Sequence, residues 1–131
     1  MKYVLEMDEE QAQLTKNALE FYARIIIGQW NMIGEELLDL HDENYAEKKE
    51  LLDEGMYTLR RIVYPDLPPG ASYGVTSKEK SCLVWEICQV LRHKLAWTRN
   101  PEGGWTVDFD KPISFSGKEL PKCWTEGNND E

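Results

Sequence analysis

The chain has 131 residues, 41% of them hydrophobic, which is enough to bury one core and form one small domain. Its formal net charge of −9 disfavours nucleic-acid binding, because the phosphate backbone attracts Lys and Arg and repels carboxylates. The longest apolar run, RIIIGQWNMIG, is too short and too interrupted to span a membrane, and the acidic start MKYVLEMDEEQ is unlike a signal peptide. We therefore expect a cytoplasmic protein, with three reduced cysteines that lack CxxC spacing.

The N-terminal third predicts a short strand followed by a long helix. KYVLEM, residues 2–7, is rich in β-forming residues and favours a strand. Asp8 can cap a helix with acids in its first turn. The apolar residues that follow share about half of a helical wheel. This pattern continues to about Leu40, with a bend expected near Gly28 and Gly34.

Two further helices are predicted. The second runs from about Asn44 to Tyr64 and has one apolar side; it ends there because Pro65 disfavours a helical conformation for the preceding residue. A proline- and glycine-rich loop follows. Thr76 and Glu79 then form a capping-box pattern for a third helix over about residues 77–98.

The C-terminal part predicts a turn and a second strand. NPEGG, residues 100–104, ends the third helix, and WTVDFD, residues 105–110, alternates like a half-buried strand. We expect a mainly α fold, a three-helix core with a small antiparallel β element formed by the N-terminal and C-terminal segments. Residues 1–123 form the single domain, and the polar residues 124–131 form a disordered tail.

Polar residues interrupt the apolar faces of the first and third predicted helices. On the third helix, Arg92 falls inside the apolar arc, with Gln89 and His93 at its edge. Gln29 lies near the middle of the apolar arc of the first helix. A buried arginine without a partner would cost several kcal/mol, so Arg92 must meet a carboxylate, carbonyl groups or a bound anion.

Two interpretations of these polar residues remain open. They form either a closed network with a tyrosine hydroxyl and an acid, or an open pocket with aromatic walls, suited to phosphates and stacked bases. Local charge favours the pocket, because residues 60–99 hold seven basic and three acidic residues, a net +4. The candidate ligand-binding residues are Tyr22, Gln29, Arg60, Tyr64, Trp85, Gln89, Arg92, His93 and Trp97.

No catalytic group, metal ligand set or cofactor site is predicted. Glu35, Glu36 and Asp39 partly resemble the first motif of the all-helical nucleotide pyrophosphohydrolases, which hold magnesium between acids on neighbouring helices. The second motif of that family is blurred here, with Glu50 and Asp53 on the solvated side of their helix. A solvated acidic surface is the favoured interpretation, and a magnesium-dependent hydrolase is an alternative.

Three stretches, LEFYARIIIGQW, QVLRHKLAWTRNP and GGWTVDFDKP, together resemble a family of small bacteriophage-encoded proteins, in the pattern RIxxGQ, QVxRHxLAW and PxGG. The resemblance runs from the first helix to about Pro112 and brings no settled activity with it. It implies a phage context. By analogy of traits, the chain is similar to phage sponges, which are homo-oligomers that sequester nucleotide signals of bacterial immune systems such as Thoeris and CBASS.

The leading hypothesis is a non-enzymatic homo-oligomer that binds a small nucleotide-type anion and blocks host immune signalling. Arg92 would bind phosphate, Gln29 and Gln89 would contact polar edges, and Trp85 or Trp97 would stack on a base. The alternative from another class is a protein-binding inhibitor of a host protein. Its contact surface would be the proline-rich loop together with Tyr57, Arg60 and Tyr64.

Overall fold

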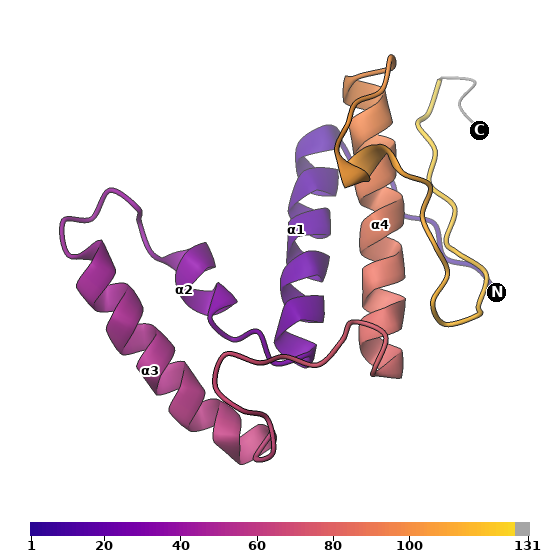
Figure 1. Cartoon of the computed structure of the whole chain (residues 1–131). Helices are drawn as coiled ribbons and strands as arrows, with labels where there is room; N and C mark the ends of the chain where they lie inside the picture. The colour runs from indigo at the N-terminus through magenta and orange to yellow at the C-terminus, as the bar shows by residue number, and fades with distance from the viewer. Residues whose placement is uncertain (128–131) are drawn as a thin grey trace.

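The computed structural model describes residues 1–127, whose regular structure is helical throughout. The α-helices are α1 (Glu9–Ile26), α2 (Met32–Leu37), α3 (Tyr45–Val63) and α4 (Glu79–Arg99), and the 3-10 helix η1 (Val107–Phe109) follows. α1 and α4 lie side by side, whereas α3 leans away from them beyond the short α2 (Figure 1). The mainly α fold is therefore confirmed, and none of these helices is long and apolar enough to cross a membrane.

The predicted β element is wrong, because residues 1–127 contain no strand. Residues 2–6 are exposed and pair with no other segment as a strand, while residues 107–109 form η1. Around η1, a side chain supplies a hydrogen bond that a partner strand would otherwise make: the Trp97 indole nitrogen donates to the carbonyl oxygen of Phe109 at 3.1 Å. Alternation of apolar and polar residues at 105–110 was thus the wrong signal.

The first predicted helix is capped as expected but ends early. Asp8 and Gln11 form a capping box, each side chain accepting from the other residue's backbone N–H. α1 ends before Gly28, which has a φ of 95° that other residues rarely adopt. A Cβ atom at Gly28 would come within 2.6 Å of the Leu67 side chain. The chain therefore turns here, and the expected single helix becomes α1 and α2.

The other two helices lie close to their predicted ranges. α3 matches within one residue at each end, and α4 begins two residues later than expected. The capping box of Thr76 with Glu79 is not formed, because the N-cap residue of α4 is Lys78 and makes no side-chain capping bond. Of the predicted tail, residues 124–127 are irregular, and residues 128–131 lie outside the described residues.

The core lies mainly between α1 and α4. Ala23 on α1 and Val84, Cys88 and Leu95 on α4 are buried there. α2 is the only described helix that packs along α3. A second, smaller centre forms where Leu67 packs over Gly28, at the foot of α1.

Candidate functional site

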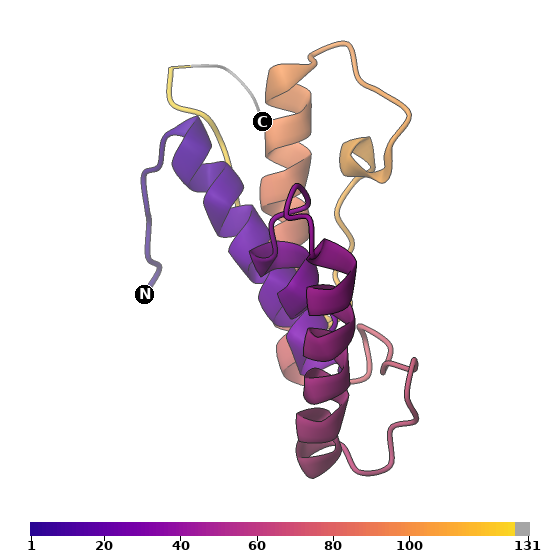
Figure 2. The same ribbon diagram turned by 90° about the vertical axis from the view of Figure 1, so that its left-hand side faces the viewer.

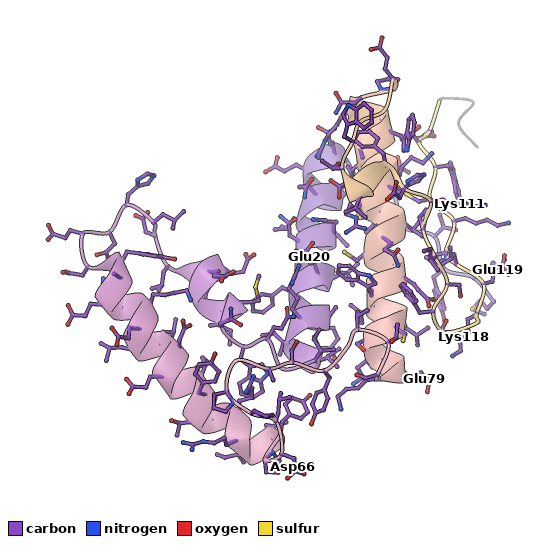
Figure 3. All side chains as sticks on the ribbon, viewed as in Figure 1. Glu20, Asp66, Glu79, Lys111, Lys118 and Glu119 are labelled. Atoms are coloured by element: carbon purple, nitrogen blue, oxygen red, sulfur yellow. The ribbon has the colours of Figure 1, made fainter. Side chains whose placement is uncertain are left out.

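Residues 105–118 form a segment that we call the C-terminal strap. It contains η1, which packs against α4, and the chain after η1 runs along α4 on the side away from α1 (Figures 1 and 2). Lys111 and Lys118 lie on this segment beside α4, whereas Glu20 lies on α1 (Figure 3). The strap is fastened by polar side chains from one side of α4, namely Glu86, Gln89, Arg92 and Trp97. Three of these four residues belong to the predicted ligand-binding set.

Glu86 is the strongest of these fastenings. Its carboxylate is 2% exposed and accepts from the backbone N–H groups of Phe115 at 2.8 Å and Ser116 at 2.7 Å. The Ser116 hydroxyl donates to the other oxygen at 2.9 Å. Successive backbone N–H groups form an anion-binding concavity, and here a carboxylate of the same chain fills it. Hydrogen bonds thus stabilise a buried charge, because a bond to a charged group contributes about 1.5–3 kcal/mol.

Gln89 holds the strap one turn further along α4. Its amide nitrogen donates to the carbonyl oxygen of Ile113 at 3.4 Å, and the Ile113 N–H donates back to the amide oxygen at 3.5 Å. This reciprocal pair is long but satisfies both backbone groups of Ile113. Gln89 therefore acts as a partner for an unpaired, extended backbone.

Arg92 lies between an acid and an aromatic ring. Its Nε atom is 3.3 Å from a carboxylate oxygen of Asp108, and its guanidinium carbon is 5.4 Å from the ring centre of Trp85. The Arg92 side chain is 15% exposed and that of Asp108 is 44% exposed. Asp108 supplies the carboxylate that Arg92 was expected to meet, although the buried Nε atom makes no hydrogen bond.

Trp97 and His93 complete this side of α4. The ring centres of Trp97 and Phe109 lie 5.4 Å apart in an edge-to-face contact, and His93 contacts Trp97 with ring centres 6.3 Å apart. Gly103 fits against the Trp97 ring, where an added Cβ would come within 3.0 Å. These contacts hold the turn before the strap close to the end of α4.

A second cluster surrounds Arg60, which was expected to contribute to a protein contact surface with Tyr57 and Tyr64. Arg60 is only 3% exposed. One guanidinium nitrogen donates to the carbonyl oxygens of Gly28 at 2.7 Å and Ala71 at 2.9 Å, and the other donates to Pro68 at 2.8 Å and Leu67 at 3.5 Å. Arg60 is therefore not available on a contact surface, because the loop after α3 folds over this side of the helix. Arg60 joins three chain segments.

Tyr64 and Gln29 belong to the same region. The Tyr64 hydroxyl donates to the carbonyl oxygen of Ile26 at 2.6 Å. The Gln29 oxygen accepts from Arg24 at 2.9 Å, and its nitrogen donates to Ser72 at 3.3 Å. These bonds tie the foot of α1 to the loop that follows α3. Asp66, at the turn just beyond α3, marks the start of that loop in Figure 3.

The nine predicted ligand-binding residues therefore do not surround a single site within residues 1–127. Five line the strap side of α4: Trp85, Gln89, Arg92, His93 and Trp97. Three gather at the foot of α1: Gln29, Arg60 and Tyr64. Tyr22 lies alone on α1 with 45% of its surface exposed. An open hollow on α3, bounded by Tyr45, Lys49, Asp53 and Tyr57, contains none of the nine.

Sequence reasoning missed Glu86 and Asp108. Glu86 did carry a signal, since a helical wheel places it beside Leu83, Val90 and Trp97 on the second apolar side of its helix. An acid in such a position needs hydrogen-bond donors in the same way that Arg92 needs an acceptor. Asp108 carried no signal, because acids in irregular segments are usually solvated.

The acids predicted as an alternative magnesium site remain on the surface. Glu35, Glu36 and Asp39 are exposed, and Asp53 is bonded to Lys49 at 2.6 Å, which raises the pKa of Lys49. The described residues contain no group of His, Cys, Asp and Glu side chains placed to hold a metal ion. No disulfide joins Cys82, Cys88 and Cys123, and burial raises the pKa of the Cys88 thiol.

The sequence matches no protein-family model, and comparison with curated proteins and with solved structures finds no match. The resemblance to phage-encoded proteins stays a prediction. Functional inference therefore rests on the chain's own geometry.

Proposed function

We propose that this protein is a non-catalytic protein-binding module that presents the apolar side chains of its C-terminal strap to a partner. One observation carries the proposal. The backbone groups of Ile113 and Phe115 are held by Gln89 and Glu86, while the two residues remain 58% and 41% exposed. At the start of the strap, Trp105 is 104% exposed. α4 thus fixes the strap at Ile113 and Phe115 while leaving both of these side chains exposed.

Such an arrangement suits binding better than folding. Exposed apolar patches in soluble proteins mark interaction sites, and Trp and Phe are enriched among the residues that contribute most to binding. A segment fixed in its bound conformation loses less conformational entropy on association. Buried Glu86 supplies that fixation, so a buried charge on α4 has a purpose in binding.

The chemistry of the partner follows from charge. The chain carries −9 overall, and acidic residues such as Asp110 and Glu102 flank the exposed Trp105. Opposite charges steer association and are screened by salt. We therefore propose a basic protein with an apolar pocket as the partner, which agrees in class with an inhibitor of a host protein.

The direct experiment is capture from a host lysate with the full chain, followed by mass spectrometry. We expect a basic protein whose capture falls as salt is raised and is lost in Trp105→Ala, a variant that leaves the melting temperature unchanged. Leu40→Ala is the matched control, because Leu40 is 73% exposed but lies far along the chain from the strap. Equal capture by wild type and Trp105→Ala contradicts the proposal.

A small nucleotide-type anion is the second candidate, and the stacking of Arg92 on Trp85 favours it. Asp108 already forms an ion pair with the guanidinium group of Arg92. Binding of an anion to Arg92 therefore requires the half-exposed Asp108 side chain to move away. Calorimetry with cyclic dinucleotides and ADP-ribose derivatives tests this candidate. If this candidate is correct, Asp108→Asn should bind the anion more tightly, because the variant removes the competing negative charge. The absence of a heat of binding with both wild type and Asp108→Asn excludes the candidate. Host immune signalling is the process that such sequestration would block.

A further inference from the structure

α3 carries an apolar stripe on a side that α2 does not cover. Leu51, Gly55, Leu59 and Ile62 follow one another at spacings of four, four and three residues, which places them on one side of a helix. The three large side chains are 62%, 49% and 77% exposed. Figure 1 shows α3 extending away from the α1–α4 pair, so this side of the helix faces no other helix of the described chain.

The exposed area is large enough for an interface between chains. The chain exposes 9634 Å², whereas a compact monomer of 15.3 kDa exposes about 7,100 Å². The difference is about 2,500 Å², and a stable interface removes about 800 Å² from each partner. Part of this difference belongs to the extended ends of the chain. The stripe is the part that lies on a regular helix, where a second helix can pack.

Gly55 points to close packing at the middle of the stripe. Glycine within a helix costs roughly 0.5–1 kcal/mol relative to alanine. A Cβ atom at Gly55 would meet nothing within 4 Å in its own chain, so internal packing does not require this glycine. A missing side chain does allow another helix backbone to approach closely.

Charge on one flank of the stripe indicates which helix can pack against it. Glu47, Glu54 and Arg61 lie seven residues apart and are all exposed, so they line one flank. In an antiparallel pair of α3 helices centred near Gly55, Arg61 comes beside the partner's Glu47, and two-fold symmetry repeats the pair. In a parallel two-fold pair this flank would instead face the other flank of the partner helix, so Glu47 and Arg61 would not meet. The flank is therefore complementary to itself only in the antiparallel sense.

We propose that the stripe binds a second copy of this chain, forming an antiparallel α3–α3 dimer with Gly55 at its centre. This interface goes beyond the proposed function, because it uses none of the strap residues. It gives the homo-oligomer expected from the sequence a defined contact surface, on a different helix from α4. The dimer would carry two straps.

Sedimentation equilibrium of the full chain tests the proposal. We expect twice the mass of one 15.3 kDa chain at micromolar concentration. Gly55→Gln should give a monomer with no loss of helix content, because glutamine favours helix but blocks close approach. The proposal is overturned if the dimer persists in Gly55→Gln. It is also overturned if the wild-type protein is still a monomer at concentrations about 100 times higher.

A charge exchange tests the antiparallel register. Arg61→Glu and Glu47→Arg should each weaken the dimer about tenfold, since two symmetric pairs become repulsive, and the double variant should restore it. Glu10→Arg is the matched control, because it makes the same change of charge at an exposed acid of α1, away from this interface. If the double variant is as weak as either single one, the register is wrong. Trp105→Ala should leave the mass unchanged, so failure of this proposal is distinguishable from failure of the strap proposal.

Discussion

The two arms of the molecule are held in different ways. α4 packs along α1 through buried apolar residues such as Ala23 and Cys88, and polar side chains add the strap to this pair. Among the helices of residues 1–127, α2 alone lies along α3. The C-terminal end of α3 is held to the rest of the chain by Arg60 and Tyr64. A helix with a broad apolar interface tolerates the loss of one bond. A helix fastened at one end depends on a few polar groups.

Removing Arg60 is the largest single change that this comparison predicts. Arg60→Ala leaves four carbonyl acceptors without their charged donor, and we expect a loss of about 3 kcal/mol or more in the free energy of unfolding. Urea denaturation measures the loss. Hydrogen exchange should show that the amides of Leu67 and of residues 70–73 lose protection before those of α1 and α4.

Adjacent arginines supply the control. Arg60→Lys should cost more than 1 kcal/mol, because one ammonium cannot reproduce the planar pattern of donors, whereas Arg61→Lys on the exposed side should stay within about 0.5 kcal/mol. Equal effects at the two positions would mean that the carbonyl contacts of Arg60 contribute nothing specific. α3 would then be held by apolar contacts after all.

Removing Glu86 should release the strap and leave the α1–α4 pair intact. Glu86→Ala removes the acceptor of three hydrogen bonds, and we expect a loss of about 2–3 kcal/mol in the free energy of unfolding. The amides of Phe115 and Ser116 should then exchange faster, while those of α4 stay protected. Glu36→Ala, at an exposed acid of α2 and away from the strap, should leave both measurements unchanged. Unchanged exchange at 115 and 116 in Glu86→Ala would show that the strap is held by other contacts.

The helices were predictable because each carries local signals. The capping box of Asp8, the amphipathic pattern of α3 and the apolar faces of α4 depend on residues within a few turns of one another. The need of Arg92 for a polar partner was predictable in the same way. The identity of that partner was not predictable, because Asp108 reaches Arg92 through a turn whose shape depends on Gly103 and Trp97.

The burial of Arg60 shows the other limit of sequence reasoning. Its position on a helical wheel is polar. The segments that cover it supply only backbone carbonyl oxygens as acceptors, and every residue of any sequence has such an oxygen. The same holds for Glu86, whose partners are backbone N–H groups of an irregular segment. Both polar groups were visible in the sequence. Their backbone partners became identifiable only with the tertiary structure.

The smallest predicted effect concerns the apolar side of the comparison, at Cys88 between α1 and α4. Cys88 is 0% exposed, and burial raises the pKa of its thiol above the ordinary value. The thiol also donates to the carbonyl oxygen of Lys16 at 3.7 Å, a bond that the thiolate cannot make. Ionisation of Cys88 is therefore unfavourable in the folded protein.

The sign of the pH dependence follows from this raised pKa. In the unfolded chain the thiol loses its proton near pH 8.5, while in the folded protein it keeps it, so the unfolded state binds fewer protons above that pH. The contribution of Cys88 to stability is complete below the unfolded pKa and is lost as pH rises through the folded pKa. The slope is at most about 1.4 kcal/mol per pH unit.

Urea titrations between pH 7 and 10 under reducing conditions should show a steeper decline of the free energy of unfolding for wild type than for Cys88→Ala. Parallel curves for wild type and Cys88→Ala would mean that water reaches this thiol, and that the α1–α4 interface is less tightly closed than the burial of Cys88 indicates.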